Sequence, residues 1–424
     1  MFSFGGKSLA ALFALALNFY VARFYGAEAL GILGIVNAVL LFAGLFATAG
    51  TSTAVLRLLP EHLTRYSPAS AWRVYRQLLV LVVTCGLLTG AALYLLSAPL
   101  AGHVFAKPYL APLLAFTGLV VPAYGVYQLA VEGLRALKWI RVYGVFQFLP
   151  RASHLLLILV VGLFVHDRYV PVWALWASFA LLSLLALGLT FHAFAAGRRD
   201  RGPVEPVPMS AVAGLALPMF LTSAMSIVIG QTDTVMLGAM RSEGEVGVYQ
   251  IALRLGLLAA FILNAVNTMV APKFSEIYHG GDREALVQLS TQCSRLIFWS
   301  TVPVLAALVV LGPWILGWFG PEYPAGYSAL LFLAAGQFVN SMSGSVGYFL
   351  NMTGDHKVFR NIIMTAAALN VLLNWLLIPR FGIEGAALAS MIAVVVWNLA
   401  SVFYIRRRHG FYIWYLPGLA RRRA

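Results

Sequence analysis

Long runs of apolar residues, separated by short stretches that contain charged residues, glycine or proline, cover almost the whole chain. A transmembrane helix needs about 20 such residues, and runs of this length lack the two-residue alternation of outer-membrane strands. The pattern predicts an all-α polytopic membrane protein with twelve transmembrane helices. Their approximate limits are 5–23, 29–56, 77–101, 109–133, 144–165, 170–196, 210–238, 246–271, 293–319, 326–350, 359–379 and 384–405.

Composition supports this class and excludes others. Hydrophobic residues make up 61% of the 424 and charged residues only 10%, with a mean hydropathy of +0.85. A soluble enzyme or a disordered chain would be far more polar, and two cysteines, Cys85 and Cys293, cannot form a disulfide framework. The apolar stretch between Lys7 and Val21 is interpreted as a retained span and not as a cleaved signal.

The cations indicate the orientation of these helices. With a cytoplasmic N-terminus, 22 of the 29 Lys and Arg residues fall in inner segments and five in outer loops. This bias follows the positive-inside rule and places both termini in the cytoplasm. The net charge of +14 therefore reflects topology, and nucleic acid is not expected as a partner. The tail Phe411–Ala424, which mixes aromatic residues with three terminal arginines, is expected on the inner leaflet surface, with a solvated end as the alternative.

The stretch Arg198–Pro208 is the most polar one between spans and contains three prolines. It divides the chain into an N-lobe (1–200), a C-lobe (201–409) and a basic aromatic tail (410–424). Glycine and cation positions recur between the halves at shifts of 216 and 219 residues, which suggests duplication. An even number of spans in each half makes the lobes parallel, with a central cavity between them.

Several short motifs carry a family resemblance. They are Tyr25-Gly26, Leu30-Gly31, Gln231-Thr232-Asp233, Leu237-Gly238, Val246-Gly247-Val248-Tyr249, Ala252-Leu253-Arg254, and Gly382 to Gly385 followed by Ala386-Ala387-Leu388-Ala389. With these motifs the chain resembles the Wzx-type oligosaccharide (polysaccharide or O-antigen) flippases of the multidrug/oligosaccharidyl-lipid/polysaccharide exporter superfamily. That superfamily also contains the multidrug and toxin extrusion transporters and the lipid II flippase.

The resemblance implies a function. A flippase of this type passes an undecaprenyl-pyrophosphate-linked oligosaccharide from the inner to the outer leaflet of the bacterial inner membrane by alternating access, for surface polysaccharide synthesis. Expected partners are this lipid-linked oligosaccharide, the membrane lipids and a polysaccharide polymerase machinery. Relatives in the flippase branches often have fourteen spans, and twelve here leave open an ion-coupled exporter of cationic compounds.

Motifs for catalysis or cofactors are missing from the sequence. No zinc-binding spacing, nucleophile elbow or ATP-binding motif occurs. A transporter and not an enzyme is expected, with no cofactor and no metal. Its driving force would then be H⁺, Na⁺, the membrane potential or downstream consumption of the lipid.

Three charged residues lie in the interior of predicted spans, away from the span ends, where each costs about 2.5–3.5 kcal/mol without a partner or water. Asp233 and Arg254 lie at similar predicted depth on adjacent spans. They form either a structural ion pair or a site in which Arg254 binds phosphate or sugar and Asp233 holds it or takes up a proton or cation. Arg151 is expected to contact the pyrophosphate, and the alternatives are a pair with Glu132 or hydrogen bonds to backbone carbonyls.

Further polar residues are candidates for the wall of the cavity. Lys7 and Arg23 bracket the first span and could guard its inner and outer mouths, although snorkelling to headgroups explains both. Uncharged polar side chains recur at helical spacing and would either accept sugar hydroxyls or form interhelical hydrogen bonds. They are Tyr124, Asn264, Asn267, Gln337, Asn340, Asn370 and Asn374.

Overall fold

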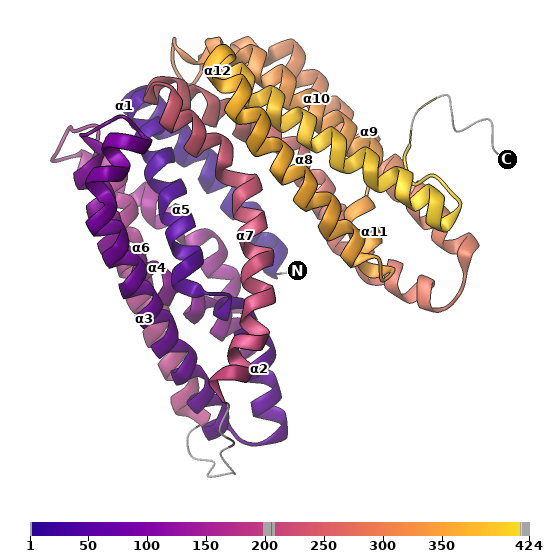
Figure 1. Ribbon diagram of the computed structural model, residues 1–424, viewed down its shortest axis with the longest axis horizontal. Helices are drawn as coiled ribbons and strands as arrows, with labels where there is room; N and C mark the ends of the chain where they lie inside the picture. Colours follow the sequence, from indigo (N-terminus) through magenta and orange to yellow (C-terminus); the bar gives the residue numbers. More distant parts are fainter. Residues whose placement is uncertain (1, 198–204, 206–207, 416, 418–424) are drawn as a thin grey trace. The chain divides into compact units, whose positions relative to one another are not determined.

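The computed structural model describes residues 2–197, 205, 208–415 and 417, and all regular structure in these residues is helical (Figure 1). The elements are α1 (Phe2–Thr48), α2 (Thr51–Arg65), α3 (Pro68–Pro99), η1 (Leu100–Val104), α4 (Leu110–Ala136), α5 (Ile140–Gly162), α6 (Val170–Gly197), α7 (Met209–Met240), α8 (Glu243–His279), α9 (Arg283–Gly317), η2 (Tyr323–Gly326), α10 (Tyr327–Ser343), α11 (Val346–Met352) and α12 (His356–His409). They form two compact units, Met1–Ala239 and Met240–Ala424.

The helices account for the predicted spans. Within the described residues, nine helices are long and apolar enough to cross a membrane, or ten when η2, α10 and α11 count as one broken span. Two of these candidates contain two spans each, because α1 breaks at Gly26 and α12 breaks at Gly382. Twelve spans therefore fit the described part of the chain, and the chain is a multi-pass membrane protein.

Both breaks depend on glycine. Gly26 has φ 83° and ψ 174°, and Gly382 has φ 55° and ψ −129°. A residue with a Cβ is strained in these regions, whereas glycine enters them freely. The chain therefore turns between spans one and two, and between spans eleven and twelve, without a separate loop.

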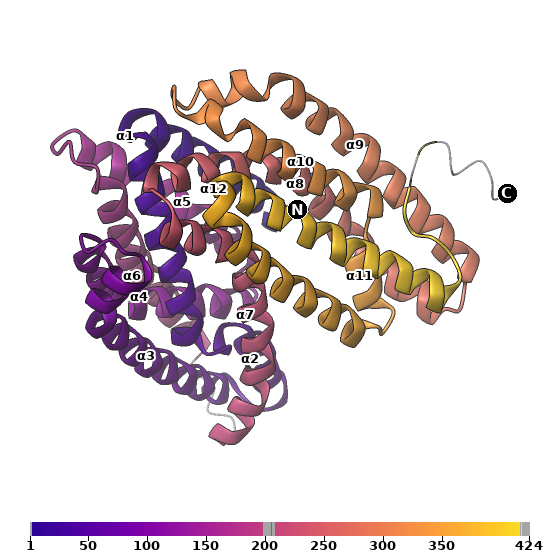
Figure 2. The same ribbon diagram turned by 45° about the horizontal axis from the view of Figure 1, so that its top comes forward.

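The first unit is a bundle built around α4. Helix α4 packs along α3 on one side and α6 on another, and α1 packs along α5 (Figure 2). The short helix α2 packs against α3 and α4, and the start of α7 joins the same core through Val212 and Ala216. This brings α7 into the first unit, so the compact units divide one helix later than the predicted lobe boundary at residue 200. The parallel duplicated lobes stay a prediction.

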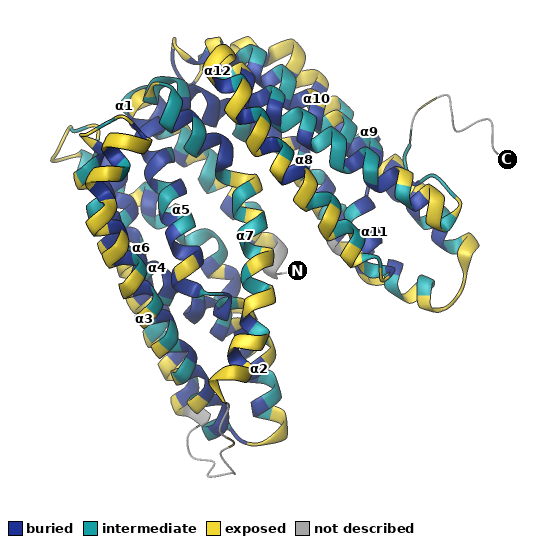
Figure 3. Ribbon diagram, viewed as in Figure 1, coloured by how far each residue is buried: buried dark blue, intermediate teal, exposed yellow. Residues whose placement is uncertain are grey.

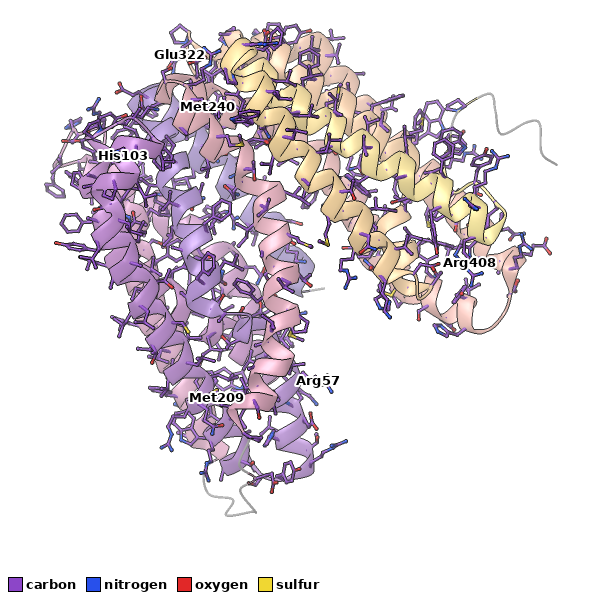
Figure 4. The ribbon with its side chains drawn as sticks, viewed as in Figure 1. Arg57, His103, Met209, Met240, Glu322 and Arg408 are labelled. Atoms are coloured by element: carbon purple, nitrogen blue, oxygen red, sulfur yellow. The ribbon has the colours of Figure 1, made fainter. Side chains whose placement is uncertain are left out.

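The second unit has α10 at its centre. Helix α10 packs against α8, α9 and α12, and α11 packs against α8 and α12 (Figure 1). The loops of this unit lie at two opposite ends, which Glu322 and Arg408 mark in Figure 4.

The lipid-facing surface is visible in the burial pattern. Exposed positions follow one side of α3 along its length (Figure 3), and they include the large apolar side chains of Leu87, Leu88 and Leu95. A surface of this kind would be unfavourable in water but is natural in hydrocarbon.

One predicted span is too long. The second span was expected to reach residue 56, but α1 ends at Thr48 and the chain turns at Ala49 and Gly50, whose φ angles are 46° and 78°. A separate amphipathic helix, α2, follows, with Leu59 buried and Arg57 exposed. The left-handed residues end the span, because a continuous helix cannot pass through them.

The described part of the C-terminal tail packs against the second unit. The Ser294 hydroxyl donates to the Ile413 carbonyl at 2.6 Å, and the Tyr415 amide donates to the Met342 carbonyl at 2.9 Å. Ile413 is fully buried. Burial of Ile413 and two hydrogen bonds to backbone carbonyls therefore hold residues 411–415 against the second unit. Their place at the inner leaflet surface stays a prediction. Residue 416 and the basic end 418–424 lie outside the described residues.

Candidate functional site

One face of α4 carries a row of polar side chains in the first unit. Tyr124, Gln128 and Glu132 follow each other at four-residue spacing, so they share a face of the helix. The Gln128 amide donates to the Tyr124 hydroxyl at 2.7 Å. Glu132 forms an ion pair of 3.3 Å with Arg135, and the Arg135 guanidinium lies 5.2 Å from the ring centre of Tyr143 on α5. The row thus leads from the Arg135 end of α4 into the span.

A proline on α5 fixes the neighbouring tyrosine. Pro150 has no N–H, so the carbonyl of Phe146, four residues earlier, loses its helical donor. The Tyr127 hydroxyl donates to that carbonyl at 3.0 Å. A buried carbonyl in a membrane span needs such a partner. Tyr127 thereby joins α4 to α5 at Phe146, five residues before Arg151.

Arg151 is the main candidate for binding an anion. It follows Pro150 on α5, eleven residues after the helix begins and thus about 16 Å along its axis. Its side chain is exposed and makes no hydrogen bond or ion pair with another residue in the part of the chain that is described. Its guanidinium interacts electrostatically with the hydroxyl groups of Tyr124 and Tyr127. These donors are therefore available to a ligand.

The alternative pairing of Arg151 with Glu132 is not what the structure shows. Glu132 forms its ion pair with Arg135 instead, because the two side chains are three residues apart on one helix face. The exposed side chain of Lys7 on α1 also interacts electrostatically with Glu132. Lys7 is thus placed beside this carboxylate at the same end of the first unit.

Arg23 lies near the other end of the first unit. Its side chain is exposed and precedes the break at Gly26 by three residues. A salt bridge that the sequence does not reveal lies close to Arg23 along the chain. Arg168 donates to the Glu28 carboxylate at 2.6 Å and joins the start of the second span to the loop before α6. The two residues are 140 positions apart, so no local pattern could reveal the pair.

A groove of about 560 Å³ is also present in the first unit, at the end where α4 and α6 begin. Its lining is largely aromatic and includes Tyr109, Trp173 and Trp176. Tyrosine and tryptophan gather at this level of membrane proteins, where their rings lie among the headgroups. We attribute the groove to this aromatic belt.

The predicted pair of Asp233 and Arg254 is divided between the two compact units. Asp233 is buried on α7 of the first unit, with 6% of its surface exposed. Arg254 is half-buried on α8 of the second unit. Each is thus described within its own unit, and both the ion pair and the binding role stay predictions.

Most of the predicted polar wall in the second unit is engaged in hydrogen bonds. The Asn398 amide donates to Asn340 at 3.2 Å, and Asn340 donates to Gln337 at 3.1 Å. The Asn374 amide donates to Asn370 at 3.1 Å. The first of these bonds joins α12 to α10, which is the helix-to-helix bonding given as the alternative to a sugar-binding wall.

The remaining members of that set differ in their exposure. Asn370 also donates to the Ser390 hydroxyl at 3.3 Å, across the two halves of α12. On α8, Asn264 is exposed and Asn267 is 3% exposed. Tyr124 of the first unit is buried but keeps its hydroxyl beside Arg151. Of the predicted polar wall, Asn264 and Tyr124 therefore stay candidates for contact with a ligand.

Solved structures of known proteins have a similar fold. A solved structure of a multidrug resistance MATE family transporter of the MOP superfamily, inward-facing, aligns with a TM-score of 0.76 and 16% identity, over 98% of this chain and 96% of that one. The lipid II flippase MurJ, in an inward closed conformation, aligns with a TM-score of 0.70 and 15% identity, over 95% of this chain and 86% of that one. At such identities these likenesses show the fold, and they agree with the predicted twelve-helix class.

A sequence relative carries a functional name. The probable flippase AglR of Haloferax volcanii is 26% identical over 174 residues, which are 40% of this chain and 36% of AglR. The alignment thus covers a little over a third of that relative. The family of polysaccharide biosynthesis proteins matches residues 20–322, which is more than half of the chain. The chain therefore belongs to the polysaccharide biosynthesis protein family, as the resemblance to Wzx-type flippases predicts.

Proposed function

We propose that the protein is a flippase that moves an undecaprenyl-pyrophosphate-linked oligosaccharide from the inner to the outer leaflet of a bacterial inner membrane by alternating access. The family match and the relative named a probable flippase support a lipid-linked glycan as the substrate class. The carrier lipid, the direction and the membrane belong to the proposal.

The observation that carries the proposal is the state of Arg151. It is a cation inside an apolar span, exposed, and without a hydrogen bond or ion pair to any other residue that the structure describes. A charge within a membrane span is costly unless a partner or water offsets it. A guanidinium is the side chain best suited to phosphate oxygens, because its planar N–H groups bind two of them at once. A pyrophosphate would supply that partner.

The surrounding groups fit an anionic lipid head. Lys7 and Arg135 lie at the predicted cytoplasmic end of the first unit, and Arg151 lies deeper on α5. A pyrophosphate that enters from that end would meet cations first and then Arg151. The Tyr124 hydroxyl accepts from Gln128 and keeps its own proton, so it adds one donor beside the guanidinium. An exporter of cationic compounds would be expected to place carboxylates at this depth instead.

Energy coupling and partners complete the proposal. Coupling to H⁺, Na⁺ or the membrane potential is expected, since the sequence has no ATP-binding motif. A polysaccharide polymerase would consume the flipped lipid and keep the direction of transport outward.

The test is complementation of a strain that lacks its oligosaccharide flippase. Wild type, Arg151→Ala, Arg254→Ala and the control Arg57→Ala, which removes an exposed cation of α2, are compared at equal expression. We expect rescue of surface polysaccharide by wild type and by the control, and loss of rescue with Arg151→Ala. Failure of wild type together with raised resistance to cationic dyes would contradict the proposal and favour the exporter.

A further inference from the structure

A small basic pocket lies at one end of the second unit. It has a volume of about 280 Å³ and is formed by the end of α8, the start of α9 and the end of α12. Figure 4 labels Arg408 at this end. The residues that matter to its chemistry are Tyr278, Asp282, Arg283, Arg408, His409 and Phe411.

Local backbone structure holds the pocket in shape. The Asp282 carboxylate caps α9 by accepting from the Ala285 amide at 2.9 Å. Gly410 ends α12 in the left-handed region, with φ 80°. The Arg283 guanidinium donates to the His409 carbonyl at 2.8 Å, and a Cβ on Gly410 would lie 2.5 Å from the same nitrogen. The turn at Gly410 is therefore what brings Arg283 against the end of α12.

The charged side chains of the pocket favour binding of an anion. Its lining holds two arginines and one acid, Asp282, which caps α9, so the lining carries a net positive charge. Asp355 accepts from His409 at 2.9 Å and is not part of the lining. Arg283 uses one donor for the His409 carbonyl, and a guanidinium has five. Arg408 makes no hydrogen bond or ion pair with the other residues that are described. Two arginines thus hold donors that fit phosphate oxygens.

The position of the pocket indicates where the anion comes from. The excess of cations in these segments predicts that this end of the spans faces the cytoplasmic leaflet, whose lipids include anionic ones. Tyr412 and Trp414 stack beside it with ring centres 5.4 Å apart, and Arg406 lies 4.2 Å from the ring centre of Tyr412. Aromatic and basic side chains of this kind mark the headgroup level.

We propose that Arg283 and Arg408 bind the phosphate group of an anionic phospholipid of the cytoplasmic leaflet in this pocket. The volume suits one headgroup and is small for an oligosaccharide, since sites for larger ligands measure about 300–1,000 Å³. A bound headgroup would tie the end of α12 to the start of α9. The site is independent of the transport substrate proposed above.

The test measures thermal unfolding of the purified full-length protein in detergent against added phosphatidylglycerol, phosphatidylcholine or inorganic phosphate. Phosphatidylglycerol is expected to raise the unfolding midpoint of wild type, whereas phosphatidylcholine is not. The concentration of phosphatidylglycerol at half effect should rise about tenfold in Arg283→Ala/Arg408→Ala, as expected when charge-assisted hydrogen bonds are lost. The control Lys357→Ala/Arg407→Ala removes the same charge from exposed positions outside the pocket and should respond like wild type.

Two results would overturn the proposal. An equal response of the two double variants would show that phosphatidylglycerol acts through general charge and not through this pocket. An equal response of wild type to inorganic phosphate alone would show that the anion is a free solute and not a lipid headgroup. If the double variant does not fold, Arg408→Ala alone replaces it, because its side chain makes no hydrogen bond or ion pair with another described residue.

Discussion

The Tyr127 hydroxyl donates a hydrogen bond of 3.0 Å to the backbone carbonyl of Phe146, the carbonyl that Pro150 leaves without its helical donor. This bond joins α4 to α5 five residues before Arg151. Pro150, which is visible in the sequence, therefore makes this bond necessary. The bond lies close to Arg151, the residue proposed to contact the substrate.

We expect Tyr127→Phe to lower the free energy of unfolding by about 1–3 kcal/mol, because the Phe146 carbonyl then loses its donor in an apolar surrounding. Pro150→Ala restores an N–H at position 150 and with it the helical donor. The loss caused by Tyr127→Phe should therefore be smaller in the Pro150→Ala background, a coupling that a double-mutant cycle measures from unfolding in detergent. Equal losses in the two backgrounds would contradict this account of Tyr127.

Arg151 should determine the affinity for pyrophosphate. We expect Arg151→Ala to weaken binding of undecaprenyl pyrophosphate at least about tenfold, since hydrogen bonds to a charged group contribute about 1.5–3 kcal/mol. Arg151→Lys keeps the charge but loses the planar fork, so it should fall between Ala and wild type. Binding to purified protein is measured by tryptophan fluorescence, with Arg57→Ala as the control. Unchanged affinity in Arg151→Ala would remove this residue from the site.

The sequence predicts the spans because their signal is local. About 20 apolar residues in a row suffice to indicate a helix, and Arg151 is visible as a charge within such a run. Contacts between distant positions have no such signal. The proline at 150 shows that a carbonyl lacks its donor, but it does not show that Tyr127 supplies one.

Two other features had no local signal in the sequence. The aromatic residues of 411–415 predict an interfacial tail, but they do not show that Ser294, 119 positions earlier, donates to the Ile413 carbonyl and holds this segment against the second unit. The second span reads as continuous to residue 56 because its residues stay apolar. It ends at Thr48 because Gly50 is left-handed, a property that depends on where α2 packs.

The break in α12 should be sensitive to a single methyl group. Arg241 donates to the carbonyls of Ile378 and Pro379 at 2.9–3.1 Å, which satisfies the end of the first half of the helix. Gly382→Ala places a Cβ at φ 55° and 3.0 Å from the Glu245 carboxylate. We expect a loss of about 1–3 kcal/mol in the free energy of unfolding.

The control for that substitution is Gly188→Ala on α6. A Cβ there meets nothing within 4 Å, so the change should leave stability equal or raise it by up to about 1 kcal/mol. Both variants are compared by unfolding in the same detergent. A Gly382→Ala protein as stable as Gly188→Ala would show that the break tolerates an ordinary side chain.

A buried histidine in α2, outside the candidate spans, gives the last prediction. His62 is 5% exposed, and its Nδ1 lies 2.9 Å from the Ser70 hydroxyl, which also accepts from the Glu205 amide at 3.1 Å. Burial lowers the pKa of His62 below its ordinary value, and the charges of Glu61 and Glu205 oppose this only in part. The folded state therefore favours the neutral imidazole of His62.

The sign of the pH effect follows from this shift. The unfolded chain binds the proton of His62 more readily than the folded one, so stability rises with pH in this range. The contribution is complete above the ordinary pKa of about 6.5 and is lost as the pH falls through the lower folded value. We expect the unfolding midpoint of wild type to fall between pH 7.5 and pH 5 by more than that of His62→Gln, which cannot titrate. His103→Gln, at an exposed histidine, should keep the wild-type dependence, and a dependence in His62→Gln as steep as in wild type would exclude His62 as its source.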